Sequence, residues 1–181
     1  LAGQRGWKCE DIYARAARPD VAGRTIMLDY VKEGSLPALY SHALACVYPS
    51  PFEGFGFPVV EAMACGTPVL TSETTSLGEI GAGAALLVDP RDVPALTRAL
   101  RTLAQDPELC ADLRARGLRR AAQDFWPPAL PPAIVSTKAR LQSKVIVDLS
   151  VATCRSICGT IVAVQHQPVW HLSNQRSESL C

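Results

Sequence analysis

Short apolar segments alternate with amphipathic ones as far as Phe125, and this alternation restricts the fold more than any other feature of the sequence. The apolar segments have the length of buried strands; they are RTIML (24–28), ACVYPS (45–50), TPVLTS (67–72) and AALLVDP (84–90). The segments with helical character are DIYARAARP (11–19), SLPALYSHALA (35–45), PVVEAMACG (58–66) and a polar-faced stretch over 92–125. Strands and helices that alternate at this pace form right-handed βαβ units. The sequence therefore predicts an α/β fold: a Rossmann-like parallel sheet with helices on both faces.

Capping residues and prolines mark the expected helix ends. Ser35 is a candidate N-cap, followed by a proline in the first turn. Gly66 is expected to end the helix that begins near Pro58. The stretch over 92–125 is expected to divide into two helices at the Asp106-Pro107 pair, and a Thr/Ser/Gly loop is expected after residue 72.

The composition and the hydrophobic pattern of the sequence change after Phe125. The segment WPPALPPA has four prolines in eight residues and cannot continue a helix. We therefore divide the chain into a domain at 1–126, incomplete at its N-terminus since the sequence opens on Leu1, and an unassigned tail at 127–181. Two interpretations of the tail stay open: a genuine appended segment, or an aberrant out-of-frame or intron-derived translation.

Composition narrows the class of protein. The 181 residues are 48% hydrophobic with a net charge of +1, as in a soluble globular chain, and this balance does not indicate a nucleic-acid partner. No apolar run approaches the roughly 20 residues of a transmembrane helix. The seven cysteines are an odd number without a C-x-x-C pair, which favours a reducing cytoplasm over disulfides or zinc. Cys46 and Cys65 lie in apolar stretches and are expected to be small buried hydrophobes.

A glycine-rich loop with two glutamates carries the chemistry. In EGFGFPVVE, Glu53 precedes the loop and Glu61 follows about one turn inside the expected helix. Backbone N–H groups at Gly54 and Gly56 can approach an anion, and the N-terminus of the helix adds partial positive charge. The loop follows a strand, so it lies at the carboxyl edge where open α/β sheets bind ligands. The pattern predicts that Glu53 meets sugar hydroxyls and that Glu61 binds the two hydroxyls of a ribose.

A structural interpretation stands beside this one. A glutamate near the start of a helix is favoured by the helix dipole alone, and Glu61 could be only that. Phe55 and Phe57 could be ordinary core aromatics. Two glutamates at this spacing are common by chance, so the surrounding sequence has to decide.

That surrounding sequence resembles a known family. The segments LAGQRGW, YVKEGSLPALYSHALACVYPSPFEGFGFPVVEAMACGTPVLTS, SLGEI and GAALLVDPRDVPAL are similar, in order and spacing, to retaining glycosyltransferases of family 4. The resemblance covers about residues 1–126 and implies the C-terminal, nucleotide-sugar-binding half of a two-domain GT-B enzyme. It implies transfer of a hexosyl unit, with a mannosyl-like donor favoured, to a hydroxyl acceptor with retention, without a metal or other cofactor.

The resemblance also assigns roles to residues. It implies that Glu53, the first glutamate of the E-x7-E motif, contacts the transferred sugar near the reacting centre, and that Glu61 binds the ribose. The distal phosphate would be held by backbone amides of Gly54, Phe55, Gly56 and Phe57, and the base would lie by Tyr30 and Val31. From its place after the strand at 67–72, Ser72 is a further candidate to face this site.

Three departures from the family pattern limit the expectation. The family's diphosphate-binding Arg and Lys, and its N-terminal domain for a glycan or lipid-linked acceptor, lie upstream of LAG. Gly78 stands where the family has Pro, which is expected to loosen that loop, and WPPALPPA replaces the closing helix. We therefore expect this chain alone to be inactive, and the full-length enzyme to work in the cytoplasm, at the cytoplasmic face of a membrane. The alternatives are a non-catalytic nucleotide-sugar-binding or relic module, and a parallel sheet whose glutamates are structural.

Other polar residues have weaker claims. His42 is expected on a helix surface, and the arginines at 114, 116, 119 and 120 on a solvated helix face. His166 and His171 share the tail with Cys154 and Cys158, but their spacing matches no standard metal site.

Overall fold

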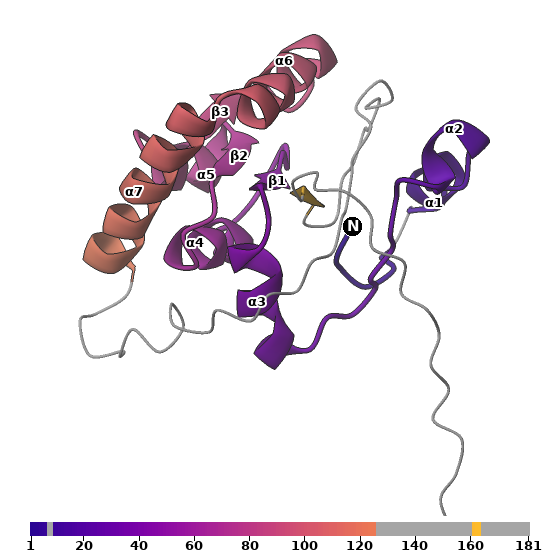
Figure 1. Cartoon of the computed structure of the whole chain (residues 1–181), viewed down its shortest axis with the longest axis horizontal. Helices are drawn as coiled ribbons and strands as arrows, with labels where there is room; N and C mark the ends of the chain where they lie inside the picture. Colours follow the sequence, from indigo (N-terminus) through magenta and orange to yellow (C-terminus); the bar gives the residue numbers. More distant parts are fainter. Residues whose placement is uncertain (7–8, 126–160, 164–181) are drawn as a thin grey trace, which may run out of the picture.

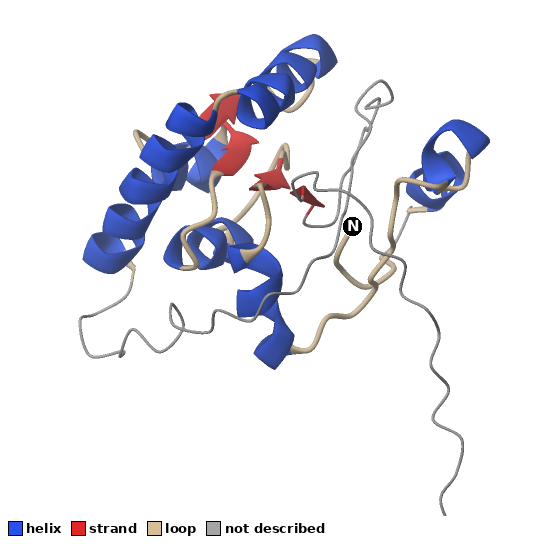
Figure 2. Ribbon diagram, in the orientation of Figure 1, coloured by secondary structure: helices blue, strands red, loops and turns tan. Residues whose placement is uncertain are grey.

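The computed structural model describes residues 1–6, 9–125 and 161–163 (Figures 1 and 2). The helices are α1 (Glu10–Ala16), α2 (Pro19–Ala22), α3 (Leu36–Ser41), α4 (Phe57–Ala64), α5 (Thr75–Gly81), α6 (Val93–Gln105) and α7 (Pro107–Asp124), with a 3-10 turn η1 (Glu33–Ser35). The strands are β1 (Ala45–Tyr48), β2 (Val69–Ser72), β3 (Leu86–Val88) and β4 (Ile161–Ala163). None of these described helices has the length and hydropathy needed to cross a bilayer.

The four strands form one sheet in the order β3-β2-β1-β4. The three strands β1, β2 and β3 are parallel, with Cys46 opposite Val69 and Leu70 opposite Leu86. This confirms the predicted parallel sheet. The fourth strand, β4, pairs antiparallel with the free edge of β1 and comes from the part of the chain that the sequence left unassigned. The rest of that tail, including WPPALPPA and the four His and Cys residues named above, lies outside the described residues.

Both faces of the sheet are covered by helices, as predicted. Successive side chains of a strand point to opposite faces, and in β1 the alternation is visible in the packing: Val47 belongs to one core cluster and Cys46 to the other. On the first face, Val47 and Leu70 pack with leucines of α6 and the first half of α7. On the second, Cys46 packs with residues of α3, α4, α5 and the last half of α7. Strands buried on both faces explain why they read as apolar runs rather than alternating ones.

The ends of the long helices follow the sequence signals. Asp106 caps α7 through its side chain, which accepts a hydrogen bond of 2.8 Å from the N–H of Leu109. The predicted division at Asp106-Pro107 is therefore confirmed. Gly66 lies just past α4 with φ of 69°, and the N–H of Thr67 donates back to the carbonyl of Ala62. This is the Schellman arrangement, so the predicted stop at Gly66 is also confirmed.

The strand predicted at 24–28 is wrong. Residues 25–29 have no regular secondary structure and no place in the sheet. Their backbone instead contacts the start of the chain, where the N–H of Leu28 donates to the carbonyl of Leu1 and that of Gly3 to Asp29, both at 2.8 Å. An apolar run forms a strand of a sheet only where a neighbouring strand pairs with it, and none of the strands described in the sheet lies beside this run. Figure 1 shows this segment, with α1 and α2, on the far side of β4 from β2 and β3.

The loop expected after residue 72 is also wrong, because residues 75–81 form helix α5. Two aliphatic side chains one turn apart, Leu77 and Ile80, are buried in the core beside α4. Their burial outweighs the low helix propensity of the surrounding Thr, Ser and Gly. Gly78 therefore lies inside a helix rather than in a loosened loop, and a Cβ there would overlap the carbonyl oxygen of Glu73.

Candidate functional site

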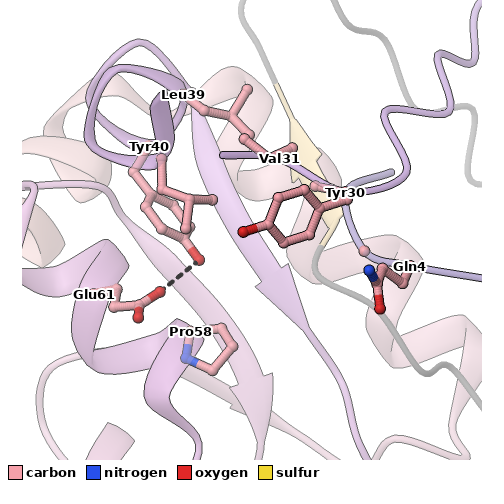
Figure 3. A pocket seen from close by; sticks show the side chains of 10 residues that line it. Gln4, Tyr30, Val31, Leu39, Tyr40, Pro58 and Glu61 are labelled. Carbon is pink, nitrogen blue, oxygen red and sulfur yellow. Dashed lines mark hydrogen bonds between the residues drawn. The ribbon is translucent and has the colours of Figure 1, made fainter. Parts of the chain in front are cut away.

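A cavity of about 200 Å³ lies at the carboxyl edge of the sheet, where α4 begins (Figure 3). Its walls come from three parts of the chain: residues 2–4, the segment from Tyr30 to Tyr40, and the first two turns of α4. Tyr30, Val31 and Glu61 all line it, so three residues singled out from the sequence meet in one place. Glu61 is the only charged residue among the described residues that line it.

Tyr40 holds the carboxylate of Glu61 from one side. Its hydroxyl donates a hydrogen bond of 3.3 Å to Oε2 of Glu61. Tyr40 is only 3% exposed and packs in the core, while its carbonyl accepts a hydrogen bond of 2.7 Å from the hydroxyl of Thr67. Figure 3 shows the Tyr30 ring extending into the cavity opposite this pair. The cavity thus has a carboxylate at one end and an exposed aromatic ring at the other.

Glu53 lies outside the cavity, in the loop between β1 and α4. Its Oε1 accepts a hydrogen bond of 2.6 Å from the hydroxyl of Tyr48, the last residue of β1. Its carbonyl accepts another, of 2.9 Å, from the hydroxyl of Ser76. The side chain is half-buried. The two glutamates therefore lie on one loop-and-helix unit, but only Glu61 opens into the cavity.

The glycine loop leaves several backbone donors unused. Among the described residues, none accepts a hydrogen bond from the N–H of Gly54, Phe55 or Gly56. Gly56 is the N-cap of α4 and has a left-handed backbone with φ of 100°. Unsatisfied N–H groups at the start of a helix form a site that attracts anions. Phe55 and Phe57 contact each other with ring centroids 4.6 Å apart, but both are exposed, so they are not core aromatics.

Ser72 is not brought to the cavity. It is fully buried, and its hydroxyl donates to the carbonyl of Ser50 in the loop before Glu53. Thr71 and Thr74 make the same kind of contact, with the carbonyls of Tyr48 and Pro51. Together with Ser76, these hydroxyls form a row that holds segment 48–53 against β2 and the start of α5. The sequence placed Thr71 and Ser72 in a strand and the Thr and Ser residues that follow them in a loop, so this bracing role was missed.

Two buried or half-buried thiols lie near Glu61. Burial raises the pKa of the fully buried Cys46 thiol far above its ordinary value, and the charge of Glu61 adds to this effect. Burial, followed by the charge of Glu61, raises the pKa of Cys65 to about 11. Both thiols are free and protonated near neutral pH. Cys46 is the small buried hydrophobe expected from the sequence, whereas Cys65, for which the same was expected, is partly exposed.

The remaining polar residues of interest have structural roles in the described part of the chain. His42 is partly exposed just after the end of α3, with its Nδ1 2.8 Å from the carbonyl of Ala38. Arg116 pairs with Asp112 one turn away, as expected for a solvated face. Arg120 departs from that expectation, because it donates to the carbonyl of Glu79 at the end of α5. Within the same described residues, no group of three or more His, Cys, Asp or Glu could hold a metal ion.

The parallel sheet with helices on both faces defines a Rossmann-like α/β class of protein, and comparison with known proteins gives the family. Residues 6–120 match the family Glycosyl transferases group 1, and the chain belongs to this family.

Its similar relatives include the O-antigen chain mannosyltransferase B of Escherichia coli, 41% identical over 70% of this chain and 33% of the relative. The serotype-specific mannosyltransferase WbdA of Escherichia coli is 33% identical over 68% of this chain and 15% of the relative. The glycogen synthase of Mycobacterium tuberculosis is 36% identical over 69% of this chain and 30% of the relative.

Among solved structures, the sucrose-phosphate synthase of Thermosynechococcus elongatus superposes with a TM-score of 0.62 at 31% identity. The match covers 67% of this chain and 32% of the synthase. The chain therefore spans about a third or less of the length of these relatives. The family and the GT-B type of fold inferred from the sequence are confirmed.

Proposed function

We propose that this chain is the nucleotide-sugar-binding part of a retaining hexosyltransferase with a mannosyl-like donor and a hydroxyl acceptor. The observation that carries the proposal is the meeting of Glu61 and Tyr30 in one cavity beside a glycine loop with unused N–H groups. The mannosyltransferases among the relatives support the choice of sugar. The full-length enzyme would act in the cytoplasm, at the cytoplasmic face of a membrane, on a glycan or lipid-linked acceptor.

The volume of the cavity suggests which part of the substrate it would hold. A cavity of about 200 Å³ is smaller than the roughly 300–1,000 Å³ of sites that enclose whole drug-sized ligands. It would hold the nucleoside, with the base by Tyr30 and Val31 and the ribose hydroxyls on Glu61. The diphosphate would then lie over the amides of residues 54–57, which are outside the cavity, and the sugar would reach Glu53. In this arrangement a different part of the chain binds the nucleoside, the diphosphate and the sugar.

Transfer needs more than this chain provides. A retaining transfer develops positive charge at the anomeric carbon and negative charge on the leaving diphosphate, and preorganised charges stabilise both. Glu53 would face the first charge and the loop amides the second, without a metal ion. The acceptor has to be positioned by another domain, so the 181-residue chain alone would bind without transferring. A non-catalytic nucleotide-sugar-binding module is the alternative, and Glu53 distinguishes them, because only catalysis needs its charge at the reacting carbon.

The experiment is a calorimetric titration of the chain with a nucleoside diphosphate and its 2′-deoxy form. If Glu61 binds the ribose, Glu61→Gln weakens binding of the ribonucleotide by roughly 1.5–3 kcal/mol, the range for a hydrogen bond to a charged group. The deoxy form should bind both proteins equally poorly. Glu108→Gln, an exposed glutamate in the first turn of α7, is the matched control and should change neither affinity. Equal losses for both nucleotides would indicate a structural glutamate and contradict the proposal.

A further inference from the structure

The carboxylate of each glutamate in the unit formed by the glycine loop and α4 accepts a hydrogen bond from a tyrosine hydroxyl. Tyr48 donates to Glu53 at 2.6 Å and Tyr40 donates to Glu61 at 3.3 Å. The two tyrosines come from different elements, β1 and α3, and lie outside the loop and helix that carry the glutamates. Two independent parts of the fold therefore reach the two carboxylates by the same chemical group.

Tyr48 fixes a side chain that would otherwise be free to rotate. Glu53 is in a loop, where an unheld side chain of its length samples many rotamers. A separation of 2.6 Å is in the short range expected when a hydroxyl donates to an ionised carboxylate. Tyr48 itself is held, because its carbonyl accepts a hydrogen bond of 2.8 Å from Thr71 of β2. Since Ser76 holds the Glu53 carbonyl, the residue is anchored at its backbone and at its carboxylate. Among the described residues, none donates a hydrogen bond to the other carboxylate oxygen, Oε2.

Tyr40 does the same for Glu61 from within the core. The ring of Tyr40 is buried and its carbonyl is bound by Thr67, so its hydroxyl has little freedom to follow the glutamate. The hydrogen bond goes to Oε2 of Glu61, and Oε1 is the oxygen left for a ligand in the cavity. Figure 3 shows this bond, with the hydroxyl of the Tyr30 side chain directed towards it.

We propose that Tyr48 and Tyr40 are positioning residues, each tying down one oxygen of a glutamate so that the other is presented to the substrate. The inference rests on the proposed function, in which Glu53 meets the sugar and Glu61 the ribose. It follows that the two hydroxyls act on different parts of the substrate. Loss of the Tyr48 hydroxyl weakens recognition of the sugar, and loss of the Tyr40 hydroxyl weakens recognition of the ribose.

The test measures two ligand preferences in each of two variants of the whole 181-residue chain: nucleotide-sugar over free nucleoside diphosphate, and ribose over deoxyribose. GDP-mannose, UDP-glucose and ADP-glucose are titrated first, and the tightest is carried forward with its free nucleoside diphosphate and its 2′-deoxy form. Tyr48→Phe is expected to reduce the preference for the nucleotide-sugar over the free diphosphate about three- to tenfold, as for the loss of one hydrogen bond. Tyr40→Phe should leave that preference intact and reduce the preference for ribose over deoxyribose by a similar factor. Each variant is the control for the other.

Double variants separate positioning from general stability. If Tyr48 acts through Glu53, adding Tyr48→Phe to Glu53→Gln changes the sugar preference no further, since coupled residues are not additive. The same holds for Tyr40→Phe added to Glu61→Gln and the ribose preference. Thermal midpoints of all variants show whether a loss reflects folding, although removal of a hydroxyl alone keeps the ring in place.

The outcomes are distinct. If the glutamate variants lose their selective preferences but the tyrosine variants do not, or if each tyrosine variant weakens all ligands equally, the positioning role is refuted and the proposed function stands. If the glutamate variants lose no selectivity, or if no nucleotide-sugar binds the wild-type chain, the proposed function fails and this inference fails with it.

Discussion

The side chain of Leu77 in α5 lies directly against the backbone of Gly56 at the start of α4. A Cβ added to Gly56 would overlap Cδ2 of Leu77, which is itself fully buried. The same glycine has φ of 100°, a conformation that residues with a side chain rarely adopt. Two separate requirements for glycine therefore coincide at one position of the loop. Because α5 sets this contact, the helix that the sequence did not predict helps to shape the candidate anion site.

Replacement of Gly56 by alanine is expected to destabilise the fold by roughly 1–3 kcal/mol, from backbone strain together with the displaced Leu77. Gly54→Ala is the matched control, because a Cβ there has nothing within 4 Å and the backbone is not left-handed. Its free energy of unfolding should stay within about 0.5 kcal/mol of the wild type. Urea denaturation measures both. Equal stability of the two variants would show that Leu77 does not constrain the loop.

The elements that the sequence predicted are those whose signals are local. The strands at 45–50 and 67–72 are buried on both faces and the strand at 84–90 is at least half-buried, so an apolar run identifies each. The loop predicted after residue 72 and the strand predicted at 24–28 were wrong, because the conformation of these segments depends on contacts with distant parts of the chain. Helix α5 forms because Leu77 and Ile80 are buried in the core, and residues 25–29 have no partner strand in the described sheet.

The same distinction holds for the candidate site. The glycine loop and its glutamates could be singled out from spacing and family resemblance. The partners of those glutamates could not, since Tyr40 and Glu61 are 21 residues apart and meet only because α3 packs against α4. Tyr48 is five residues from Glu53, so a tyrosine ending a strand just before the motif is a signal that could have been used.

Thr67 supports Tyr40, and we expect Thr67→Val to cost about 1 kcal/mol of stability. The hydroxyl of Thr67 is buried and donates to the carbonyl of Tyr40; valine keeps the shape but removes the hydrogen bond, whose net worth is of that order. Thr102→Val on α6 is the control, because its hydroxyl also donates to a backbone carbonyl but is exposed. Chemical denaturation of the two variants should show a clear loss only for Thr67. A comparable loss at Thr102 would attribute the effect to the substitution type rather than to burial.

The raised pKa of Cys65 predicts slow alkylation that depends on Glu61. Only the thiolate reacts, and with a pKa of about 11 roughly one thiol in a thousand is ionised at pH 8. The rate should therefore rise as pH increases towards 11. Glu61→Gln removes a negative charge that favours the neutral thiol, so the pKa falls and alkylation at a fixed pH becomes faster. Cys46, which is fully buried, should stay unreactive in both proteins.

Peptide mapping by mass spectrometry after iodoacetamide treatment measures each thiol separately. Glu108→Gln, in the first turn of α7, is expected to leave the alkylation rate of Cys65 unchanged. This variant controls for a general effect of losing one negative charge. An unchanged rate in Glu61→Gln would mean that burial alone sets the pKa of Cys65, and that Glu61 does not act on it.

The free edge of β1 is covered by β4, with Ala45 opposite Ala163 and Val47 opposite Ile161. The N–H of Cys46 points the other way and donates to the carbonyl of Pro68, on the side of β2. Because successive N–H groups of a strand point to opposite edges, those of Ala45 and Val47 point towards β4. Hydrogen exchange at Ala45 and Val47 therefore reports on the pairing of β1 with β4, and exchange at Cys46 reports on its pairing with the segment at β2.

Removal of residues 127–181 is expected to accelerate hydrogen exchange at Ala45 and Val47 while leaving Cys46 protected. The denaturation midpoint should hardly change, because the residues described in both core clusters lie within 1–126. Ala163→Pro in the full-length chain is the matched variant: it removes one N–H from β4 and should give faster exchange at Ala45 without a truncation. Amide exchange followed residue by residue by NMR measures all three positions. Unchanged exchange at Ala45 and Val47 would show that β4 is not paired with β1 in solution. A large fall in the midpoint would place part of the folding unit beyond residue 126, against the proposed domain boundary.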